Sequence, residues 1–350
     1  MDIRIPSLLR IKPDALFKLG KYLRKYGFDR IALFYGEGIE DLVGQSVRIS
    51  LASSEITVVT QQIALSNDAD AIVRTAFRLP RGTQAIVAVG GGVAVDVGKY
   101  VAFLNRLPVI AVPTAISNDG FASPGASLLV DGGTRISATA TIPFGVVIDT
   151  TVIRNCPPRF TLSGIGDLIS KYSAISDWKR SYHATGEAIN DFATTIAMQS
   201  VENLVFHPVK SIDDLEFLQL VCGALVMSGV AMEVAGSSRP ASGSEHLISH
   251  AYDQIADRPR MHGEQVGVAT IATTWLQKNP HHSTVRRVLD ETGFSAAMKH
   301  DPLDRSTFLQ AVRLATTIKP GYYTVLSEPG AVEELERYLN EDPLWGDYLA

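Results

Sequence analysis

The sequence has 350 residues, of which 46% are hydrophobic and 20% charged, so it can bury a sizeable core and is not a disordered chain. Its formal net charge of -5 gives no electrostatic reason to expect a nucleic-acid partner. Cys156 and Cys222 are too far apart to form a CxxC pair, which argues against a disulfide-rich secreted scaffold and favours a reducing cytoplasm.

Short apolar runs alternate with helix-length segments in the first 150 residues. Strands are expected at 31–35, 56–59, 85–89 and 108–112, and helices at 13–26, 67–78 and 93–104. Continuous apolar strands separated by helices are typical of a parallel sheet covered on both faces. Because such sheets bind ligands at the carboxyl ends of their strands, the loops after Val89 and Val112 are the first candidates for a site.

The pattern becomes almost wholly helical after the double proline in Cys156–Arg159. Helices are expected at 165–181, 186–206, 213–235, 243–255, 263–278, 282–292, 304–318 and 331–340. We therefore expect an α/β nucleotide domain at 1–158, a helical domain at 159–350, and a site in the cleft between them. The first six residues hold no apolar signal-peptide core, and the apolar stretch 85–104 is interrupted by glycines and charges, so no membrane span is expected.

Two loops at strand ends carry residues suited to a dinucleotide. Gly90–Gly92 follows the strand ending at Val89; successive glycines let backbone N–H groups approach a diphosphate, although the run matches neither GxGxxG nor a Walker A loop. Pro113–Pro124 places hydroxyls, an amide and a carboxylate after the next strand, where they could grip a ribose or a polyol. The alternatives are a tight strand-to-helix turn and an ordinary polar turn.

Histidines gather in one part of the second half. His246 and His250 share a helix face at i,i+4 spacing, and His262 follows sixteen residues after His246. Asp167, at the start of an expected helix, is either an N-cap or a hard oxygen ligand. A lone helical histidine is usually an ordinary core or surface residue, but an Asp/His/His set suits zinc, nickel or iron with open positions for substrate oxygens.

In this order and spacing, these segments resemble the iron-containing alcohol dehydrogenase and dehydroquinate-synthase-like superfamily, and within it the sn-glycerol-1-phosphate dehydrogenases. The resemblance runs from about Lys12 to Leu326 and is most specific at Pro113–Pro124, Gly164–Trp178 and Ser237–His246. It implies an α/β N-terminal Rossmann-like parallel sheet plus an all-α C-terminal domain. It also implies reversible reduction of dihydroxyacetone phosphate to sn-glycerol 1-phosphate with NAD or NADP and one divalent metal (Zn, Ni or Fe).

The resemblance also implies roles for individual residues. The expected dinucleotide contacts are Gly91, Gly92, Val93, Ala94, Val95, Asp96, Thr114, Ala115, Ile116, Ser117 and Ser123. The expected metal ligands are Asp167, His246 and His262. Asp119, Asp167 and His250 are expected to contact the substrate and to form the catalytic set, with His250 not a primary metal ligand.

Arg239 is the candidate for recognising a substrate phosphate. Ser237–Ser244 brings its guanidinium and several hydroxyls up to the expected His246 helix, and guanidinium suits bidentate phosphate contacts. The alternatives are a solvated loop residue or a pair with a local carboxylate such as Glu245 or Glu233.

Two other functions fit parts of this pattern: a sugar-phosphate cyclase of the dehydroquinate-synthase type, and a non-catalytic nucleotide-binding paralogue. For partners we expect a small phosphorylated substrate, no nucleic acid, no membrane span, and a homo-oligomer, dimer or higher. Ile5–Arg10 only loosely resembles the opening segment of the family, which weakens the inference on oligomeric state.

Overall fold

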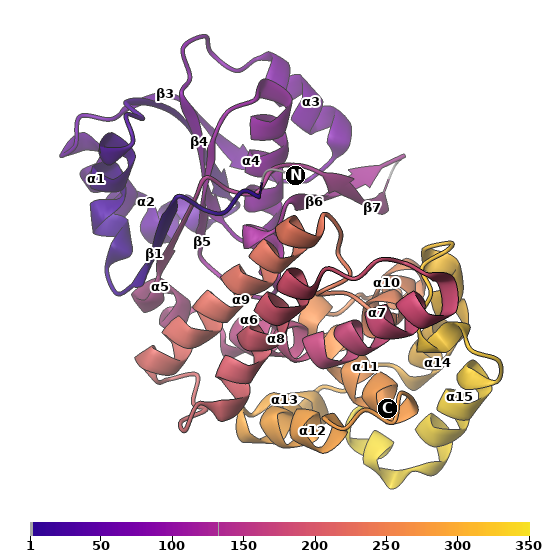
Figure 1. Ribbon diagram of the computed structural model, residues 1–350. Coiled ribbons are helices and arrows are strands. Elements are labelled where there is room, and N and C mark those ends of the chain that lie inside the picture. Colours follow the sequence, from indigo (N-terminus) through magenta and orange to yellow (C-terminus); the bar gives the residue numbers. More distant parts are fainter. Residues whose placement is uncertain (1–2, 132) are drawn as a thin grey trace. The chain divides into compact units, whose positions relative to one another are not determined.

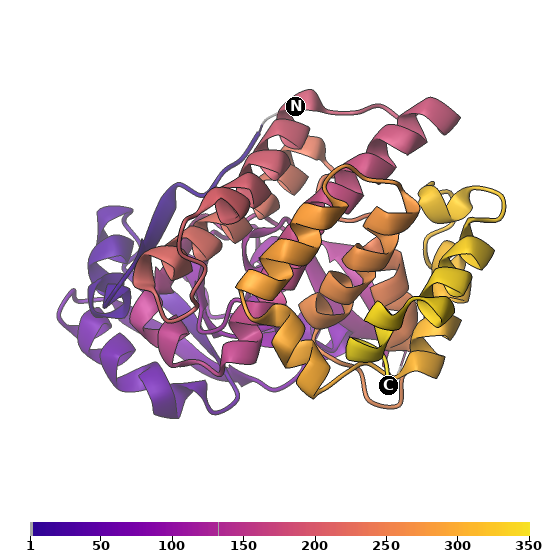
Figure 2. The same cartoon turned by 90° about the horizontal axis from the view of Figure 1, so that it is seen from below.

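The computed structural model describes residues 3–131 and 133–350. It divides into two compact units, Met1–Cys156 and Pro157–Ala350, here called the α/β unit and the helical unit (Figures 1 and 2). The expected fold class, a parallel α/β sheet followed by an all-α region, is confirmed.

The α/β unit is built on a six-stranded sheet with the order β1-β8-β5-β4-β2-β3, in which every pair is parallel. The strands are β1 (Leu8–Lys12), β2 (Arg30–Gly36), β3 (Thr57–Ala64), β4 (Ala85–Gly90), β5 (Val109–Pro113) and β8 (Gly145–Asp149). All residues of β4 and β5 are buried, as the continuous apolar runs predict for central strands.

Helices cover both faces of this sheet (Figure 1). One face packs on η1 (Ala15–Lys18), α1 (Leu19–Lys25) and α2 (Ile39–Ala52), and the other on α3 (Ala69–Phe77) and α4 (Gly92–Asn105). The remaining elements of the unit are η2 (Asp119–Ala122), the antiparallel hairpin β6 (Gly125–Val130) and β7 (Thr134–Thr139), and α5 (Thr150–Asn155).

Several elements of this unit were not expected from the sequence. Strand β1 alternates apolar residues with Arg10 and Lys12, because it lies at the edge of the sheet, where charged residues discourage pairing with other chains. The β6–β7 hairpin lies outside the parallel sheet, and β7 is largely exposed, so neither periodicity nor a long apolar run marks it.

The helical unit contains ten α-helices among the residues that the structure describes. They are α6 (Pro158–Ile169), α7 (Lys171–Thr185), α8 (Asp191–Phe206), α9 (Leu215–Ala235), α10 (Ser244–Ile255), α11 (His262–Leu276), α12 (His282–Glu291), α13 (Phe294–His300), α14 (Arg305–Ile318) and α15 (Ala331–Glu341), with the short helices η3 (Val325–Ser327) and η4 (Pro343–Asp347). Helix α11 lies centrally and contacts α6, α10, α12 and α15.

The expected helix at 165–181 is two helices, and this changes the position of Asp167. Pro158 occupies the first turn of α6, where a proline needs no N–H partner, so the helix begins well before Gly164. Asp167 consequently lies in the last turn of α6, and its reading as a helix N-cap was wrong.

Helix α9 is long and apolar enough to cross a membrane, with a mean hydropathy of 1.8 over 18 of its residues. Of that window, 67% is buried inside the structure. A core helix of a soluble protein can be equally long and apolar, and the burial of α9 fits that description.

Candidate active site

The glycine turn after β4 contains glycines of two kinds. Gly90 has φ +153°, and a Cβ there would lie 2.8 Å from the Cβ of Ala94 and 3.0 Å from the backbone nitrogen of Gly36, so the fold itself requires glycine. At Gly91 and Gly92 a Cβ would meet nothing within 4 Å. The open backbone at the N-terminus of α4 is compatible with the approach of a diphosphate.

The other expected dinucleotide contacts on α4 differ in what they expose. Val93 is 40% exposed, whereas Ala94 and Val95 are buried and can offer little to a ligand but backbone. Asp96 is half-buried, and burial raises the pKa of its carboxyl to about 6. The α4 start therefore presents mainly main-chain groups.

A buried lysine, Lys99 of α4, holds the loop after β5 in place through hydrogen bonds. Its Nζ donates to the carbonyl oxygen of Gly120 at 2.7 Å, to Oγ of Ser123 at 3.3 Å and to the carbonyl oxygen of Gly125. Burial lowers the pKa of Lys99 to about 8. The hydroxyl of Ser123 is thus bonded within the loop, which limits what it can offer a dinucleotide.

The remaining loop residues lie close to the glycine turn. The backbone N–H of Thr114 donates to the carbonyl oxygen of Gly90 at 3.0 Å and joins the two loops. Ile116 is fully buried, while Ala115 and Ser117 are half-buried. Asp119 is half-buried and begins η2. Within the α/β unit the structure therefore gathers the expected cofactor residues at the carboxyl ends of β4 and β5.

In the helical unit, Asp167, His246 and His262 converge from α6, α10 and α11. Each offers one ligand atom, and these atoms lie within 4.8 Å of one another. Asp167 and His246 are buried and His262 is half-buried. Nε2 of His246 lies 3.3 Å from Oδ1 of Asp167. One carboxylate and two imidazoles at this spacing form a donor set that zinc, nickel or iron accepts.

Glycines bring α6 and α11 close enough to make this cluster. A Cβ on Gly166 would lie 2.1 Å from the carbonyl oxygen of Gly263, and a Cβ on Gly263 would lie 1.8 Å from that of Ser163. The glycines immediately precede Asp167 and follow His262. The close backbone approach therefore sets the separation of two candidate ligands.

His250 lies beside the cluster but is not part of it. Its ring centroid is 6.2 Å from that of His246 and 5.8 Å from that of His262, whereas the His246 and His262 centroids are 5.0 Å apart. This arrangement leaves His250 as a side chain next to the candidate metal position.

Charged neighbours shift the pKa values of two candidate ligands, Asp167 and His246. Burial alone would raise the pKa of Asp167, but Lys171 and His246 outweigh it and hold that pKa well below its usual range. Lys171 is fully buried, and its Nζ lies 2.9 Å from the carbonyl oxygen and 3.5 Å from Oδ1 of Asp167. Burial lowers the pKa of His246, yet hydrogen bonds to Asp167 and Glu245 raise it overall to about 9.

Each candidate ligand histidine has an acceptor for its second ring nitrogen. Nδ1 of His246 lies 2.8 Å from Oε1 of Glu245, and Nδ1 of His262 lies 3.3 Å from Oγ of Ser249. The Ser249 hydroxyl itself donates to Gln265 at 2.7 Å, so it is available to accept from His262. Such acceptors fix the tautomer that leaves the other nitrogen for a metal.

Arg239 is buried among hydrogen-bond partners from the protein itself. It is 1% exposed; Nε donates to Oε1 of Glu187 at 2.8 Å, and Nη2 donates to Oε2 of the same carboxylate at 2.5 Å. Further bonds run from Nη1 to Tyr323 at 2.8 Å and from Nη2 to Ser181 at 3.1 Å, and the guanidinium lies 3.5 Å from the centroid of the Tyr322 ring. These contacts favour a structural role for Arg239 with Glu187 as its carboxylate partner, and the expected phosphate contact stays a prediction.

Sequence reasoning missed four residues that support the cluster: Lys171, Glu245, Ser249 and Glu264. Helical spacing could have indicated Lys171, four residues after Asp167, and Glu245 stands next to His246. Glu264 accepts from the N–H of Met261 at 3.3 Å and from Arg159 at 3.1 Å, which fixes the first turn of α11. No local pattern points to Ser249, whose partners come from α11.

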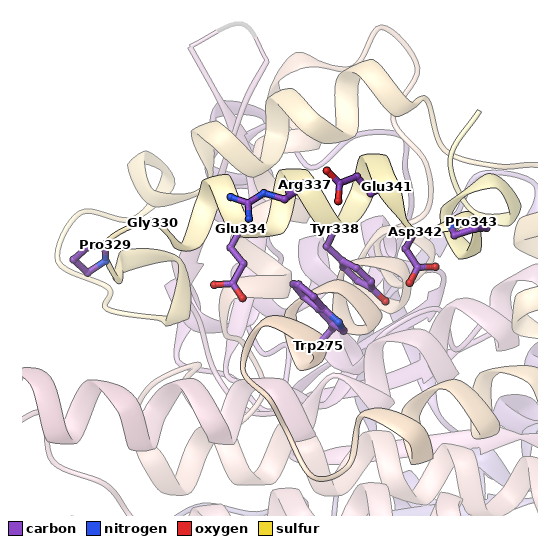
Figure 3. A pocket seen from close by; sticks show the side chains of 9 residues that line it. All are labelled: Trp275, Pro329, Gly330, Glu334, Arg337, Tyr338, Glu341, Asp342 and Pro343. Atoms are coloured by element: carbon purple, nitrogen blue, oxygen red, sulfur yellow. The ribbon is translucent and has the colours of Figure 1, made fainter.

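An open depression of about 710 Å³ elsewhere in the helical unit contains none of these residues. Its lining includes Trp275, whose ring stacks on that of Tyr338 with centroids 3.8 Å apart, and the carboxylates of Glu334, Glu341 and Asp342 (Figure 3). None of its lining residues belongs to the Asp167–His246–His262 cluster or to the glycine turn after β4, so the chemistry described above lies elsewhere.

Comparison with known proteins identifies the family of this chain. Residues 10–157 match the family model for iron-containing alcohol dehydrogenase. The chain is 34% identical to the glycerol-1-phosphate dehydrogenase [NAD(P)+] of Methanosphaera stadtmanae, over 87% of this chain and 86% of that protein. It is 33% identical to the enzyme of the same name from Staphylothermus marinus, over 95% of each.

Solved structures support the fold at lower identity. Glycerol dehydrogenase from Schizosaccharomyces pombe superposes with a TM-score of 0.76 at 20% identity, covering 96% of this chain and 91% of that one. Sulfoacetaldehyde reductase from Bifidobacterium kashiwanohense, solved in complex with NAD+, gives 0.73 at 17% identity, covering 97% and 99%. The sequence relatives decide the family: this chain belongs to the glycerol-1-phosphate dehydrogenases, NAD(P)-dependent oxidoreductases among the iron-containing alcohol dehydrogenases.

Proposed function

We propose that this protein catalyses the reversible, NAD(P)H-dependent reduction of dihydroxyacetone phosphate to sn-glycerol 1-phosphate, with one divalent metal held by Asp167, His246 and His262. The observation that carries the metal assignment is the convergence of their three ligand atoms within 4.8 Å. The substrate assignment rests on the names of relatives that share a third of their residues with this chain.

The donor set fits a divalent cation of borderline hardness. It combines one hard carboxylate oxygen with two imidazole nitrogens, and the other nitrogen of each imidazole has an acceptor in Glu245 or Ser249. When bound, NAD(P)H supplies the hydride and a zinc, nickel or ferrous ion polarises the carbonyl oxygen that becomes a hydroxyl. Nothing in the donor set distinguishes between these three metals.

The side chains of this protein bind and orient the reactants. Gly91 and Gly92 leave open backbone for the diphosphate, and Thr114–Ser117 lies at the neighbouring strand end. Asp119 and His250 are the proposed substrate contacts of the two units, and His250 lies beside the metal ligands rather than among them. Asp167 stays ionised through its pairing with Lys171 and so remains a ligand and a substrate contact.

The remaining assignments follow from this activity. The partner is a small phosphorylated molecule, and the enzyme works in the cytoplasm as a homo-oligomer. Because Arg239 already makes four hydrogen bonds within the protein, its contact with the substrate phosphate is the assignment that substitution by alanine tests.

Substitution of the three ligands tests the metal site. Asp167→Asn, His246→Ala and His262→Ala should each lose most bound metal and nearly all activity, while far-ultraviolet circular dichroism stays close to that of the unaltered protein. Metal content is measured by elemental analysis after dialysis. Stoichiometric metal retained in both histidine variants would overturn the assignment.

Turnover of the cofactor tests the reaction. A dehydrogenase consumes NADH or NADPH in proportion to dihydroxyacetone phosphate, whereas a cyclase of the dehydroquinate-synthase type returns its cofactor unchanged. A non-catalytic paralogue would bind metal and dinucleotide and turn over neither triose nor polyol phosphates. Following NAD(P)H absorbance with a triose phosphate and with a polyol phosphate therefore separates the three functions.

A further inference from the structure

The buried carboxylate of Glu245 contacts one of the two candidate ligand histidines, His246, on the ring nitrogen that faces away from Asp167. Nδ1 of His246 lies 2.8 Å from Oε1 of Glu245, while its Nε2 faces Asp167 at 3.3 Å. An imidazole that donates its Nδ1 proton to a carboxylate keeps its Nε2 lone pair for a metal and becomes more basic. The orientation of the ring and its ligand strength both depend on this contact.

Glu245 is itself held in place by the start of its own helix. It is fully buried, and Oε1 also accepts the backbone N–H of Gly243 at 2.6 Å. A Cβ on Gly243 would lie 2.9 Å from Oε2 of Glu245 and 2.8 Å from Oδ2 of Asp177. The absence of a side chain at Gly243 therefore makes room for two carboxyl groups at one helix end.

Asp177 of α7 fixes that helix end from the other side. It is fully buried; Oδ2 accepts the N–H of Ser244 at 2.7 Å, and Oδ1 accepts the N–H of Val325 at 2.8 Å. Both acids thus bond to main-chain N–H groups at the N-terminus of α10, where the helix dipole favours negative charge. The helix that carries His246 is tied to α7 and to η3.

The two ligand histidines differ in their supporting acceptors. His246 has a buried carboxylate, whereas His262 has only the neutral hydroxyl of Ser249, at the longer distance of 3.3 Å. Hydrogen bonds to charged partners are about twice as strong as those between neutral groups. The structure therefore predicts an unequal division of support between the two histidines.

We propose that Glu245 is a positioning residue for the metal centre, which holds His246 with Nδ1 protonated and Nε2 directed at the metal, and that Ser249 gives His262 a weaker version of the same support. This rests on the metal site of the proposed function. Glu245 contacts neither the substrate nor the metal in this role, so its effect is on metal affinity and on the tautomer of His246.

The test measures the affinity of the purified full chain for Zn²⁺ by competition with a chromophoric chelator. Glu245→Ala should lower the affinity about 10- to 100-fold, and Ser249→Ala by less than about tenfold. Glu245→Gln keeps a neutral acceptor and should fall between Glu245→Ala and the unaltered protein. Asp214→Asn is the matched control, because Asp214 is an acid that caps α9 through the N–H of Phe217 at 2.8 Å and is not part of the cluster; it should leave Zn²⁺ affinity unchanged.

A second measurement does not depend on activity. In the Zn²⁺-loaded protein, ¹⁵N shifts of the histidine ring should report a protonated Nδ1 for His246, and Glu245→Ala should move that Nδ1 resonance because its acceptor is lost. If Glu245→Ala does not fold by circular dichroism, Glu245→Gln and the tautomer of the unaltered protein decide the matter.

The outcomes separate the two proposals. If His246→Ala loses Zn²⁺ while both Glu245 variants bind it within about twofold of the unaltered protein, the positioning role is wrong and the metal site stands. An Nε2–H tautomer in the unaltered protein would also overturn the positioning role. If His246→Ala itself retains Zn²⁺, the metal site is wrong.

Discussion

The candidate site of the α/β unit consists mainly of main-chain groups, whereas that of the helical unit consists of side chains. In the α/β unit the glycine turn after β4 is open: a Cβ at Gly91 or Gly92 would meet no protein atom within 4 Å. In the helical unit the candidate metal ligands are side chains held in a packed setting, where Gly166 and Gly263 leave no room for even one methyl group. Glycine therefore leaves open space at the candidate site of one unit and allows close helix packing at that of the other.

This difference predicts which property each substitution changes: stability, metal binding or affinity for the dinucleotide. Changes around the metal cluster alter contacts that also hold the helices together, so they should reduce stability and metal binding together. Changes at Gly91 or Gly92 should reduce affinity for the dinucleotide and leave the fold intact. Three substitutions test this contrast, in order of the expected loss of stability.

The largest loss is expected for Arg239→Ala in the helical unit. It removes a buried guanidinium with four hydrogen bonds and leaves Glu187 without its partner. Breaking a buried pair costs about 3 kcal/mol, the lower end of the usual range, because the Glu187 side chain is one-third exposed. Chemical unfolding followed by circular dichroism measures the loss.

The same variant separates a structural from a phosphate-binding role. If Arg239 is structural, kcat/KM should fall by a similar factor on dihydroxyacetone phosphate and on dihydroxyacetone. A loss confined to the phosphorylated substrate, with unaltered unfolding, would contradict the structural role favoured by its hydrogen bonds and support the phosphate contact.

An intermediate loss is expected for Gly263→Ala. The added methyl group would meet the backbone of Ser163 at 1.8 Å, and backbone cannot rotate away as a side chain can, so α6 and α11 must separate. Overpacking of this kind costs about 1–3 kcal/mol, and the shift should also lower metal affinity because Asp167 and His262 move apart. Thermal unfolding and metal titration measure both effects.

Gly346→Ala provides the matched control in the same unit, because a Cβ there meets nothing within 4 Å. It should change neither quantity. Equal effects of the two alanines would show that the α6–α11 contact does not set the ligand spacing.

The sequence predicts four of the six strands of the parallel sheet but misses the buried strand β8 and helix α2. Buried strands such as β4 and β5 are continuous apolar runs, and outer helices such as α12 and α15 follow an apolar periodicity. The edge strand β1 carries charges that break such a run, and the exposed hairpin β6–β7 has no long apolar run. The α6–α7 boundary was missed because both helices continue the same pattern across Ser170.

The candidate site was predictable only where residue type and family resemblance coincide. Helical spacing alone pairs His246 with His250, but the three-membered cluster of the described residues takes His262 instead, because α11 returns beside α10. Arg239 illustrates the opposite case: its Ser-rich surroundings suit a phosphate, yet its carboxylate partner Glu187 lies 52 residues away, beyond any local pattern. The roles of such residues depend on tertiary contacts, which a local sequence pattern does not contain.

The smallest loss of stability is expected for Gly92→Val, which should instead weaken cofactor binding. A side chain at this position meets no protein atom within 4 Å, so the unfolding transition should move by less than about 0.5 kcal/mol, as for other exposed sites. A branched side chain would block the approach of a diphosphate to the start of α4, and the Kd for NADH should rise by at least about tenfold, the loss of one charge-assisted hydrogen bond. Quenching or enhancement of NADH fluorescence measures the Kd.

Gly98→Ala is the matched control on the same helix, because its Cβ would lie 2.5 Å from that of Ala88, against the sheet. Gly98→Ala should lower the free energy of unfolding, while the folded protein should keep its Kd for NADH. Unaltered NADH affinity in Gly92→Val would assign that glycine to the turn alone and remove the contrast between the two units.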